Sequence, residues 1–510
     1  MTSTIHSMGI NGIEAFTVMI ESDISAGLPS CDIVGLPDAS VKESKNRVRS
    51  ALKNSGLIFP LAKITINLAP ADVKKIGSIY DLPILVSLLK SNGQISSVPE
   101  QSVFIGELSL SGELCSIKGV LPMAIHAKQC GFKNIFLPES NASEAAAITG
   151  INIYPLKNVK QLYKFLKNEE SIKIQPPTII KEKKAVHKLD FCQVKGQYKA
   201  KRALEIAAAG NHNVLLIGPP GSGKSMLSKR IPSILPSMTF DEVIETTKIH
   251  SIAGMIHSES PLVCERPFRS PHHTISAVGL SGGGSMPHPG EISLAHKGVL
   301  FLDELTEFSR STMETLRQPL EEGLITISRS RSTLTFPCDI MLVAAMNPCP
   351  CGYFGDSTKQ CVCSPTAISR YLAKISGPLL DRIDIQIEVP PVAFENLSSD
   401  EEIETSAQIQ KRVEHARKIQ TERLNKWEIS SNSKIPTHVL SQACQLTPEA
   451  KEMLSKAFEI MGLSARGYDK ILKISRTIAD LADSKAVDKI HIAEALQYRS
   501  LDRKYWKRGG

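Results

Sequence analysis

Apolar and polar residues follow two repeating patterns through the N-terminal third of the chain. Alternation with a period of two at residues 15–20 and 32–34 predicts strands, because successive side chains of a strand point to opposite faces. Residues 40–55 instead place apolar side chains at helical spacing, with basic residues opposite. Later elements predicted in this region lie at 62–68, 81–90, 103–108, 123–131 and 135–137. The pattern predicts an α/β domain over residues 1–170.

A second pattern begins after residue 188. Short apolar runs within residues 214–217, 298–304 and 341–347 are typical of strands buried on both faces of a parallel sheet. Helical spacing at residues 193–209 leads into the first of these strands. We therefore expect a second α/β unit at 189–393, with a parallel sheet flanked by helices.

The rest of the chain is predicted to be helical or extended. Residues 394–510 contain four segments of helical spacing, which predict a small helical lid domain at 400–424, 447–461, 464–481 and 489–501. Residues 171–188 carry Pro176-Pro177 and several lysines without any period, as is typical of an exposed linker.

Length and composition limit the classes of protein. A chain of 510 residues is too long for one core and suggests about three domains. The net charge of +8 permits a polyanionic partner without requiring one. The N-terminal residues lack the apolar segment of a signal peptide, and no apolar run is long enough to span a membrane. We expect a cytoplasmic protein whose cysteines are reduced thiols or metal ligands.

The clearest chemical motif follows the strand at 214–217. It fits G-x-x-x-x-G-K-[ST] and consists of Gly218, Pro219, Pro220, Gly221, Ser222, Gly223, Lys224 and Ser225. Such a P-loop cradles phosphates with its backbone N–H groups. Lys224 is predicted to reach the β- and γ-phosphates of ATP, and the Ser225 hydroxyl to bind Mg²⁺.

Two acids follow the strand that begins at Gly298. Asp303 is predicted to help hold Mg²⁺, and Glu304 to polarise the attacking water. Such a pair alone is a weak signal, but the upstream P-loop makes it a strong one. Together these residues predict an ATPase.

Four cysteines form C-x-C-x₉-C-x-C at Cys349, Cys351, Cys361 and Cys363. Four thiolates can close a tetrahedral shell around Zn²⁺, and a closed shell leaves no open position for catalysis. The pattern favours structural zinc, with redox-active thiols or unligated buried cysteines as alternatives.

Residues 324–336 are predicted to form a β-hairpin with Arg329 and Arg331 near its tip. Two arginines there are candidate contacts to DNA phosphates, although a solvated, partnerless tip remains the alternative. His272 and His273 are candidate metal ligands, but local hydrogen bonding is the favoured interpretation.

The N-terminal domain resembles the proteolytic domain of Lon-type proteases. The resemblance rests on Gly106-Glu107-Leu108, Gly112-Glu113, Gly119, Ala124, Gly131 and Pro138-Glu139. That family uses a Ser–Lys dyad. The matching positions here are Ile79 and Met123. The resemblance therefore implies a Lon-like fold without peptidase chemistry.

The second unit resembles AAA+ ATPases. Asn347, at the end of a buried strand, resembles the sensor that orients the lytic water. Arg382 in GPLLDRID resembles the arginine finger, which acts on a neighbouring subunit's nucleotide and so implies a ring. The alternative is that Arg382 only pairs with Asp381 or Asp384. Arg466 resembles the second sensor arginine, which contacts nucleotide from the lid.

Taken in order, the chain resembles the YifB/ComM family of Mg-chelatase-like ATPases. The motifs that carry this resemblance are RPFRSPHHTIS, NPCPCG, GPLLDRID and SARGYDKILKISRTIADL. The resemblance implies a hexameric ring that uses ATP to move along single-stranded or branched DNA, with a role in branch migration during natural transformation. A metal-chelatase motor subunit, an ATP-dependent protease and a protein-remodelling chaperone are the alternatives.

Overall fold

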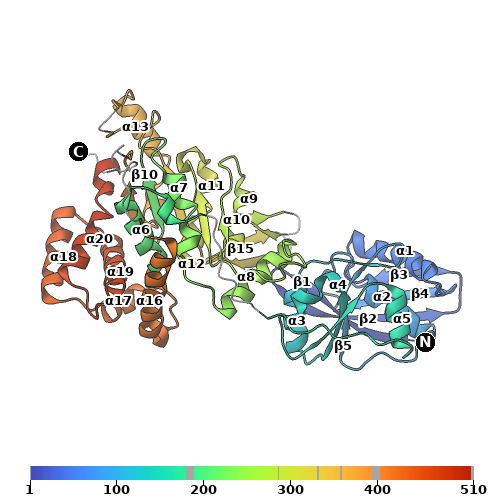
Figure 1. The fold of residues 1–510 in the computed structure, drawn as a ribbon. Coiled ribbons are helices and arrows are strands. Elements are labelled where there is room, and N and C mark those ends of the chain that lie inside the picture. Colours follow the sequence, from blue (N-terminus) through green and yellow to red (C-terminus); the bar gives the residue numbers. More distant parts are fainter. Residues whose placement is uncertain are drawn as a thin grey trace. The chain divides into compact units, whose positions relative to one another are not determined.

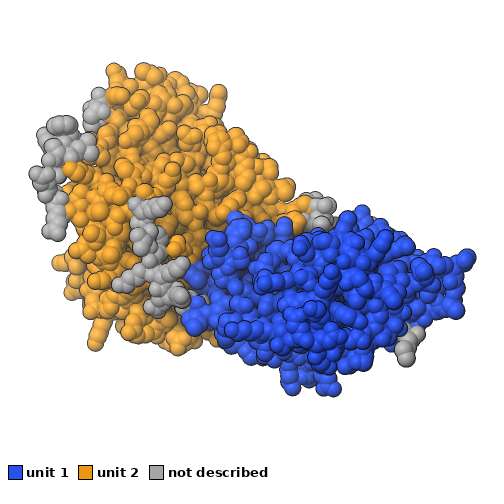
Figure 2. All heavy atoms as spheres, turned by 45° about the vertical axis from the view of Figure 1, so that its right-hand side comes forward, with its two compact units in different colours: residues 1–182, 240–264, 328–336 blue, residues 183–239, 265–327, 337–510 orange. Residues whose placement is uncertain are grey.

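The computed structural model of the chain forms two compact units (Figures 1 and 2). The residues that it describes are 2–179, 189–284, 287–329, 332–356, 359–392 and 403–506. The first unit comprises residues 1–182, 240–264 and 328–336. The second comprises residues 183–239, 265–327 and 337–510. Two stretches inside the predicted ATPase range 189–393 thus belong to the first unit.

The first unit is built on a mixed seven-stranded sheet. In spatial order its strands are β3 (Ser30–Val34), β4 (Lys63–Ala69), β2 (Glu14–Ser25), β1 (Thr2–Asn11), β5 (Ser102–Phe104), β8 (Asn134–Pro138) and β9 (Asn152–Leu156). β1 pairs with β2 antiparallel, with Ile5 opposite Ile20. Alternate residues of β4, and of β2 between Val18 and Ser22, are buried, as the period of two predicts. A small hairpin of β6 (Glu107–Leu108) and β7 (Leu114–Cys115) lies outside this sheet.

Helices cover both faces of this sheet (Figure 1). One core contains apolar residues of α1 (Ala39–Asn54), α2 (Asp81–Ser91) and α5 (Val159–Leu166). The other contains those of α3 (Val120–Gln129) and α4 (Glu139–Ala145). The positions of the protease dyad hold core residues, since Met123 is buried in α3 and Ile79 is half-buried. The α/β class of this domain is confirmed, and its likeness to Lon remains a prediction.

Helix α8 (Phe240–Ala253) follows the P-loop in sequence but packs against α3 in the first unit. The Ser251 hydroxyl donates to the buried carboxylate of Glu144 at 2.5 Å, and the Gly119 N–H donates to the Ser251 carbonyl. These buried polar groups satisfy one another, so this helix is part of the folded N-terminal unit.

The second unit contains a five-stranded sheet in which every strand pair is parallel. In spatial order its strands are β11 (Phe268–Arg269), β14 (Val299–Leu302), β17 (Met341–Met346), β10 (Val214–Ile217) and β18 (Ile385–Glu388). Every residue of β10, β14 and β17 is buried, which confirms the three predicted central strands. β15 (Leu324–Arg329) pairs with β16 (Ser332–Pro337), and β12 (Gly282–Gly283) pairs with β13 (His288–Pro289).

The helix before the P-loop strand begins later than predicted. α6 spans Tyr198–Gly210, whereas helical spacing begins at residue 193. Asp190 caps a separate 3₁₀ turn, η1 (Phe191–Gln193). Gln197 then takes a left-handed conformation at φ 57°, which interrupts the right-handed helix.

Short helices surround the rest of this sheet. They are α7 (Lys224–Ser228), η2 (Ile231–Ile234), α9 (Ala277–Ser281), α10 (Glu291–Leu294), η3 (Leu305–Glu307), α11 (Arg310–Glu314), α12 (Arg317–Glu322), α13 (Pro365–Leu372) and α14 (Gly377–Leu380).

The C-terminal residues form the predicted helical region. Its helices are α16 (Ser406–Leu424), η4 (Asn425–Trp427), η5 (Asn432–Lys434), α17 (Thr437–Ala443), α18 (Pro448–Met461), α19 (Ala465–Leu481), α20 (Lys489–Gln497) and the π-helical turn η6 (Asp502–Trp506). Side chains of Thr405, Thr447 and Ser464 cap α16, α18 and α19. Within the described parts of the chain, no helix has the length and apolar character needed to cross a membrane.

Candidate active site

The predicted phosphate and magnesium residues lie at one edge of the parallel sheet. β10, β14 and β17 are parallel neighbours, so their carboxyl ends meet there. The P-loop follows β10, Asp303 follows β14, and Asn347 follows β17. Gly218 is required by close packing, since a Cβ there would lie 2.2 Å from the Val389 carbonyl oxygen.

Lys224 is a buried lysine that points back along its own loop. Its Nζ donates to the carbonyls of Gly218 and Pro219 at 2.8 Å and to Asn347 Oδ1 at 3.3 Å. Burial lowers the pKa of Lys224 to about 8, although the nearby carboxylates of Asp303 and Glu304 act in the opposite direction. The contact between Lys224 and Asn347 joins the ends of two neighbouring strands.

Ser225 and Asp303 form an oxygen pair. The Ser225 hydroxyl donates to Asp303 Oδ2 at 2.6 Å. Hydroxyl and carboxylate oxygens are the ligand type that Mg²⁺ prefers, and two protein oxygens leave room for waters and phosphate oxygens. These residues therefore fit a magnesium ion held jointly with a nucleotide.

Glu304 lies next to Asp303 and adopts a left-handed backbone at φ 52°. Its Oε2 lies 3.7 Å from Nδ1 of His273, which is on the loop after β11. β11 is the parallel neighbour of β14, which explains why residues far apart in sequence meet. The His273 ring also contacts His272 at 4.1 Å and Phe308 at 6.4 Å between centroids.

The favoured interpretation of the histidine pair agrees with these contacts. His272 Nδ1 lies 2.9 Å from the Thr274 hydroxyl, so one histidine bonds locally. Among the described residues, neither histidine joins a group that could hold a metal. The contact of His273 with the predicted catalytic acid was missed, because sequence order does not reveal which strand neighbours β14.

A cavity of about 450 Å³ opens beside Glu304 and Asn347. Its other lining residues are Glu307, Pro350, Ala367, Arg370, Tyr371 and Lys374. Arg370 and Lys374 add positive charge near Glu304, the predicted catalytic acid, and sequence reasoning did not single them out. Both belong to or follow α13, which carries no recognisable motif.

Arg382 and Arg466 line a different cleft of about 480 Å³, which none of the P-loop residues lines. Arg382 donates to the Pro378 carbonyl at 2.7 Å and the Arg317 carbonyl at 3.1 Å, and pairs with Glu321. The alternative interpretation paired Arg382 with Asp381 or Asp384. That pairing was wrong, because the acidic partner is Glu321.

Arg466 is exposed, and its Nη1 lies 3.9 Å from Asp381 Oδ2. Asp381 directly precedes Arg382 in the chain, so the two predicted arginines share one surface. Their predicted roles toward nucleotide stay predictions.

Asp384 ties the lid to the sheet. It lies 3.3 Å from His212 Nδ1 and 3.5 Å from Lys470 Nζ, and His212 also bonds to Thr477 of α19 at 2.8 Å. Burial would raise the pKa of Asp384, but Lys470 and His212 hold it well below its usual range. The ion pair is therefore maintained at neutral pH.

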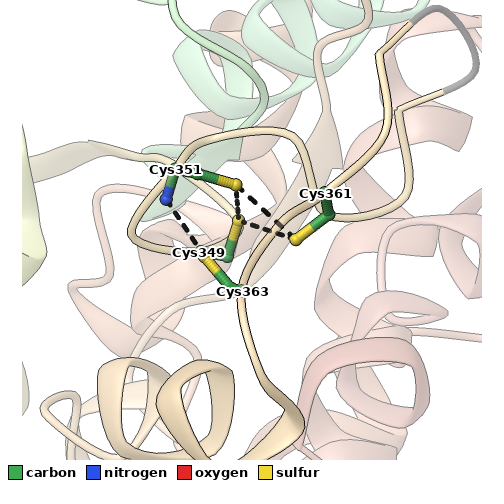
Figure 3. Close-up of side chains that lie close together, drawn as sticks. All are labelled: Cys349, Cys351, Cys361 and Cys363. Carbon is green, nitrogen blue, oxygen red and sulfur yellow. Dashed lines mark hydrogen bonds between the residues drawn. The ribbon is translucent and has the colours of Figure 1, made fainter.

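The four predicted cysteines converge (Figure 3). Their Sγ atoms all lie within 4.8 Å of one another, with Cys349 3.4 Å from Cys351 and 3.7 Å from Cys361. Burial raises the pKa of Cys351, but backbone N–H groups of Tyr353 and Val362 outweigh this effect and lower it to about 6. Four sulfurs with a ready thiolate fit a closed tetrahedral Zn²⁺ shell.

The predicted hairpin at 324–336 is confirmed as β15 and β16. The predicted DNA contacts cannot be placed on it, since Arg331 and the Arg329 side chain lie outside the described residues. The assignment of both arginines to DNA remains a prediction.

The P-loop, acids and parallel sheet define a P-loop ATPase with a helical lid. Three family models match the chain, and all three describe subunit ChlI of magnesium chelatase. The model named magnesium chelatase, subunit ChlI, matches residues 190–397, and the model named subunit ChlI of Mg-chelatase matches residues 20–141. The model of the ChlI C-terminal region matches residues 403–499. Among curated relatives, competence protein ComM of Haemophilus influenzae is 43% identical over 98% of this chain and 97% of its own. YifB of Escherichia coli is 41% identical over the same shares.

A magnesium-chelatase 67 kDa subunit of Chlorobaculum parvum is 28% identical, but the match covers 31% of this chain and 23% of that protein. The chain belongs to the YifB/ComM family of Mg-chelatase-like proteins, and is a Mg-chelatase-like AAA+ ATPase.

Proposed function

We propose that this protein is an ATP-driven ring motor that acts on DNA. The observation that carries the proposal is its identity with competence protein ComM along nearly the whole of both chains. Competence is the uptake of DNA, so a motor in this process has a DNA substrate. We assign to it movement along single-stranded or branched DNA, with branch migration as the activity on branched DNA.

The ATP cycle follows from the contacts at the sheet edge. Phosphate oxygens would replace the Gly218 and Pro219 carbonyls as acceptors for Lys224. Ser225 and Asp303 would hold Mg²⁺, which neutralises the phosphate charge that develops during transfer. Glu304 would polarise the attacking water, and Asn347 would orient it.

Assembly into a ring would supply further positive charge to the nucleotide during hydrolysis. Arg382 and Arg466 line a cleft that contains none of the P-loop residues. We propose that Arg382 acts on the nucleotide of a neighbouring copy, as an arginine finger does in trans, and that Arg466 contacts nucleotide from the lid. We propose a homo-oligomeric ring, hexameric by the family resemblance, in which Arg382 exchanges Glu321 for a γ-phosphate.

The cysteine cluster is proposed to hold structural Zn²⁺. A tetrahedral shell with Zn–S bonds of about 2.3 Å places sulfurs about 3.8 Å apart. The Sγ–Sγ separations of 3.4, 3.6 and 3.7 Å in the structure are close to that spacing. A site closed by four sulfurs gives zinc a structural role only.

A magnesium-chelatase motor subunit is the second candidate, because every family model that matches is of the chelatase type. Its named relative covers less than a third of this chain, whereas ComM covers nearly all of it. The protease alternative lacks a nucleophile, since its positions hold Ile79 and Met123. The chaperone alternative uses the same motor on protein.

ATP hydrolysis with and without single-stranded and forked DNA tests the proposal. We expect DNA to stimulate turnover, and salt to weaken the effect, because neutralised phosphates release counterions. Arg329→Ala/Arg331→Ala should lose stimulation and keep basal turnover, whereas Lys456→Ala, an exposed lid lysine paired with Glu452, should behave as the parent. Absence of stimulation by any DNA would contradict the motor and favour the chelatase or chaperone.

A further inference from the structure

The cysteine loop begins directly beside the ATP site. Asn347, which accepts a hydrogen bond from Lys224, is followed by Pro348 and then by Cys349. Cys349 is completely buried. Only one residue therefore separates the predicted water-orienting side chain from the first sulfur of the cluster.

The same loop contacts the P-loop at a second point. Gly352 has φ 85°, and a Cβ at this position would lie 2.6 Å from Cδ of Pro220. Pro220 is inside the phosphate-binding motif. The turn from Cys349 to Gly352, closed by a Gly352 N–H to Cys349 carbonyl bond, therefore packs flush against the loop that would cradle ATP.

The opposite side of the cysteine loop is supported by the C-terminal turn η6. The Phe354 ring meets the Tyr505 ring at 6.1 Å and 67°. The Tyr505 hydroxyl donates to Glu388 at 3.0 Å, and Lys504 pairs with Glu388 at 2.7 Å. Glu388 ends β18, the strand beside β10. The loop is thus held between the P-loop and the sheet's own edge.

We propose that the four-cysteine loop is a metal-dependent support of the ATP site. Coordination by four thiolates would fix the Cys349–Gly352 turn, and through it the positions of Asn347 and Pro220. Without the metal, nothing but weak sulfur hydrogen bonds joins Cys349 and Cys351 to Cys361 among the described contacts. This inference rests on the zinc assignment proposed above.

Two glycines of the loop provide a matched pair of variants. Gly352 and Gly355 both have a left-handed backbone, at φ 85° and 77°, so alanine strains each to a similar degree. A Cβ on Gly352 meets the P-loop at 2.6 Å, whereas one on Gly355 meets only the flexible end of Lys504 at 3.4 Å. Comparison of the two variants therefore distinguishes the effect of a clash with the P-loop from the effect of backbone strain in the cysteine loop.

The experiment uses the full-length chain and measures zinc content, melting temperature and affinity for a fluorescent ADP analogue. The protein as isolated should hold one zinc ion per chain. Removal with a zinc-selective chelator should weaken nucleotide affinity at least tenfold, and added zinc should restore it. Gly352→Ala should retain zinc and bind nucleotide at least tenfold more weakly, whereas Gly355→Ala should stay within twofold of the parent. Cys130→Ser, outside the cluster, should change neither zinc content nor affinity.

The outcomes distinguish this inference from the zinc assignment. If zinc leaves and nucleotide affinity stays within twofold, zinc binds but does not support the ATP site, and the inference is overturned. Equal losses in both glycine variants would also overturn it, because strain alone would explain them. If the protein neither contains nor takes up zinc, the zinc assignment fails, and the metal dependence fails with it.

Discussion

Two clefts of the second unit differ in a way that bears on how ATP is hydrolysed. One is lined by Glu304 and Asn347, the residues predicted to polarise and orient the attacking water, and Asn347 accepts a hydrogen bond from Lys224 of the P-loop. The other is lined by Arg382 and Arg466, the groups that would stabilise transition-state charge. The predicted catalytic groups are thus divided between two clefts of one chain, and this division is the basis for proposing that neighbouring copies complete one another's sites.

The largest effect is expected from Arg382→Ala. Removal of an arginine finger should lower kcat for ATP about 10³-fold. ATP affinity should remain within twofold, because the Arg382 cleft has no P-loop residue in its lining. Steady-state hydrolysis and equilibrium nucleotide binding measure the two quantities. Arg317→Ala, a nearby exposed arginine paired with Glu314, is the matched control and should leave kcat unchanged. Loss of ATP affinity in Arg382→Ala would place this arginine at its own subunit's site.

Asp384→Asn tests whether the ion pair beneath the second cleft stabilises the fold of this unit. Removing one partner from a largely buried ion pair costs about 3–5 kcal/mol. The melting temperature of this unit should fall by at least about 6 °C at pH 7. Asp469→Asn, at the rim of the same cleft, should change it little.

The difference in stability between the parent and Asp384→Asn should depend on pH in a defined direction. The folded pKa of Asp384 is lowered, so its contribution to stability is complete above pH about 4 and is lost as the pH falls further. Calorimetry should therefore show the parent and Asp384→Asn converging in acid. A constant difference down to pH 3 would show that the stability comes from packing instead of charge.

The first cleft predicts its own pH effect. Lys224 has a pKa of about 8 and would contact phosphate as an ammonium ion, so this charge is lost as the pH rises above 8. ATP affinity should fall about tenfold between pH 8 and 9.5. Lys224→Arg cannot lose its charge in this range and should give a flat profile. Isothermal calorimetry across pH 7–9.5 measures both, and an equally flat parent profile would contradict the lowered pKa.

The smallest effect is expected from His273→Ala. The exposed contact between His273 and Glu304 is worth at most about 1 kcal/mol, and its loss frees the carboxylate to approach water. Basal kcat should rise about threefold with KM for ATP unchanged, and His273→Asn should restore the parent rate. His272→Ala is the control, because His272 bonds to Thr274 instead. A fall in kcat would mean that His273 holds Glu304 in its active position.

Local signals in the sequence predicted which residues meet at the carboxyl edge of the parallel sheet. The P-loop, Asp303, Glu304 and Asn347 each follow a continuous apolar run, and parallel strands bring their carboxyl ends together. The cysteines were also predictable as a cluster, because each of the two pairs is closely spaced in the sequence. Chemistry that is set by a strand and its next few residues can be inferred from one chain.

Features that depend on distant packing could not be predicted in this way. Glu321 as the partner of Arg382 depends on how α12 packs beside α14. The placement of α8 in the first unit depends on the buried pair of Glu144 and Ser251, which are 107 residues apart. The interruption of the helical pattern at Gln197 was also missed, because a left-handed residue other than glycine carries no clear mark in the sequence.

Mixed rings test the central claim most directly. Lys224→Ala lacks the phosphate lysine and Arg382→Ala lacks the finger, so each protein alone should be inactive. They are co-expressed with different tags, and rings that carry both tags are purified. If Arg382 acts on a neighbouring copy, random 1:1 rings should regain about a quarter of parental turnover, since half of the sites have the lysine and half of their neighbours have the finger. Mixed rings as inactive as either variant would contradict the account, because Arg382 would then serve its own subunit.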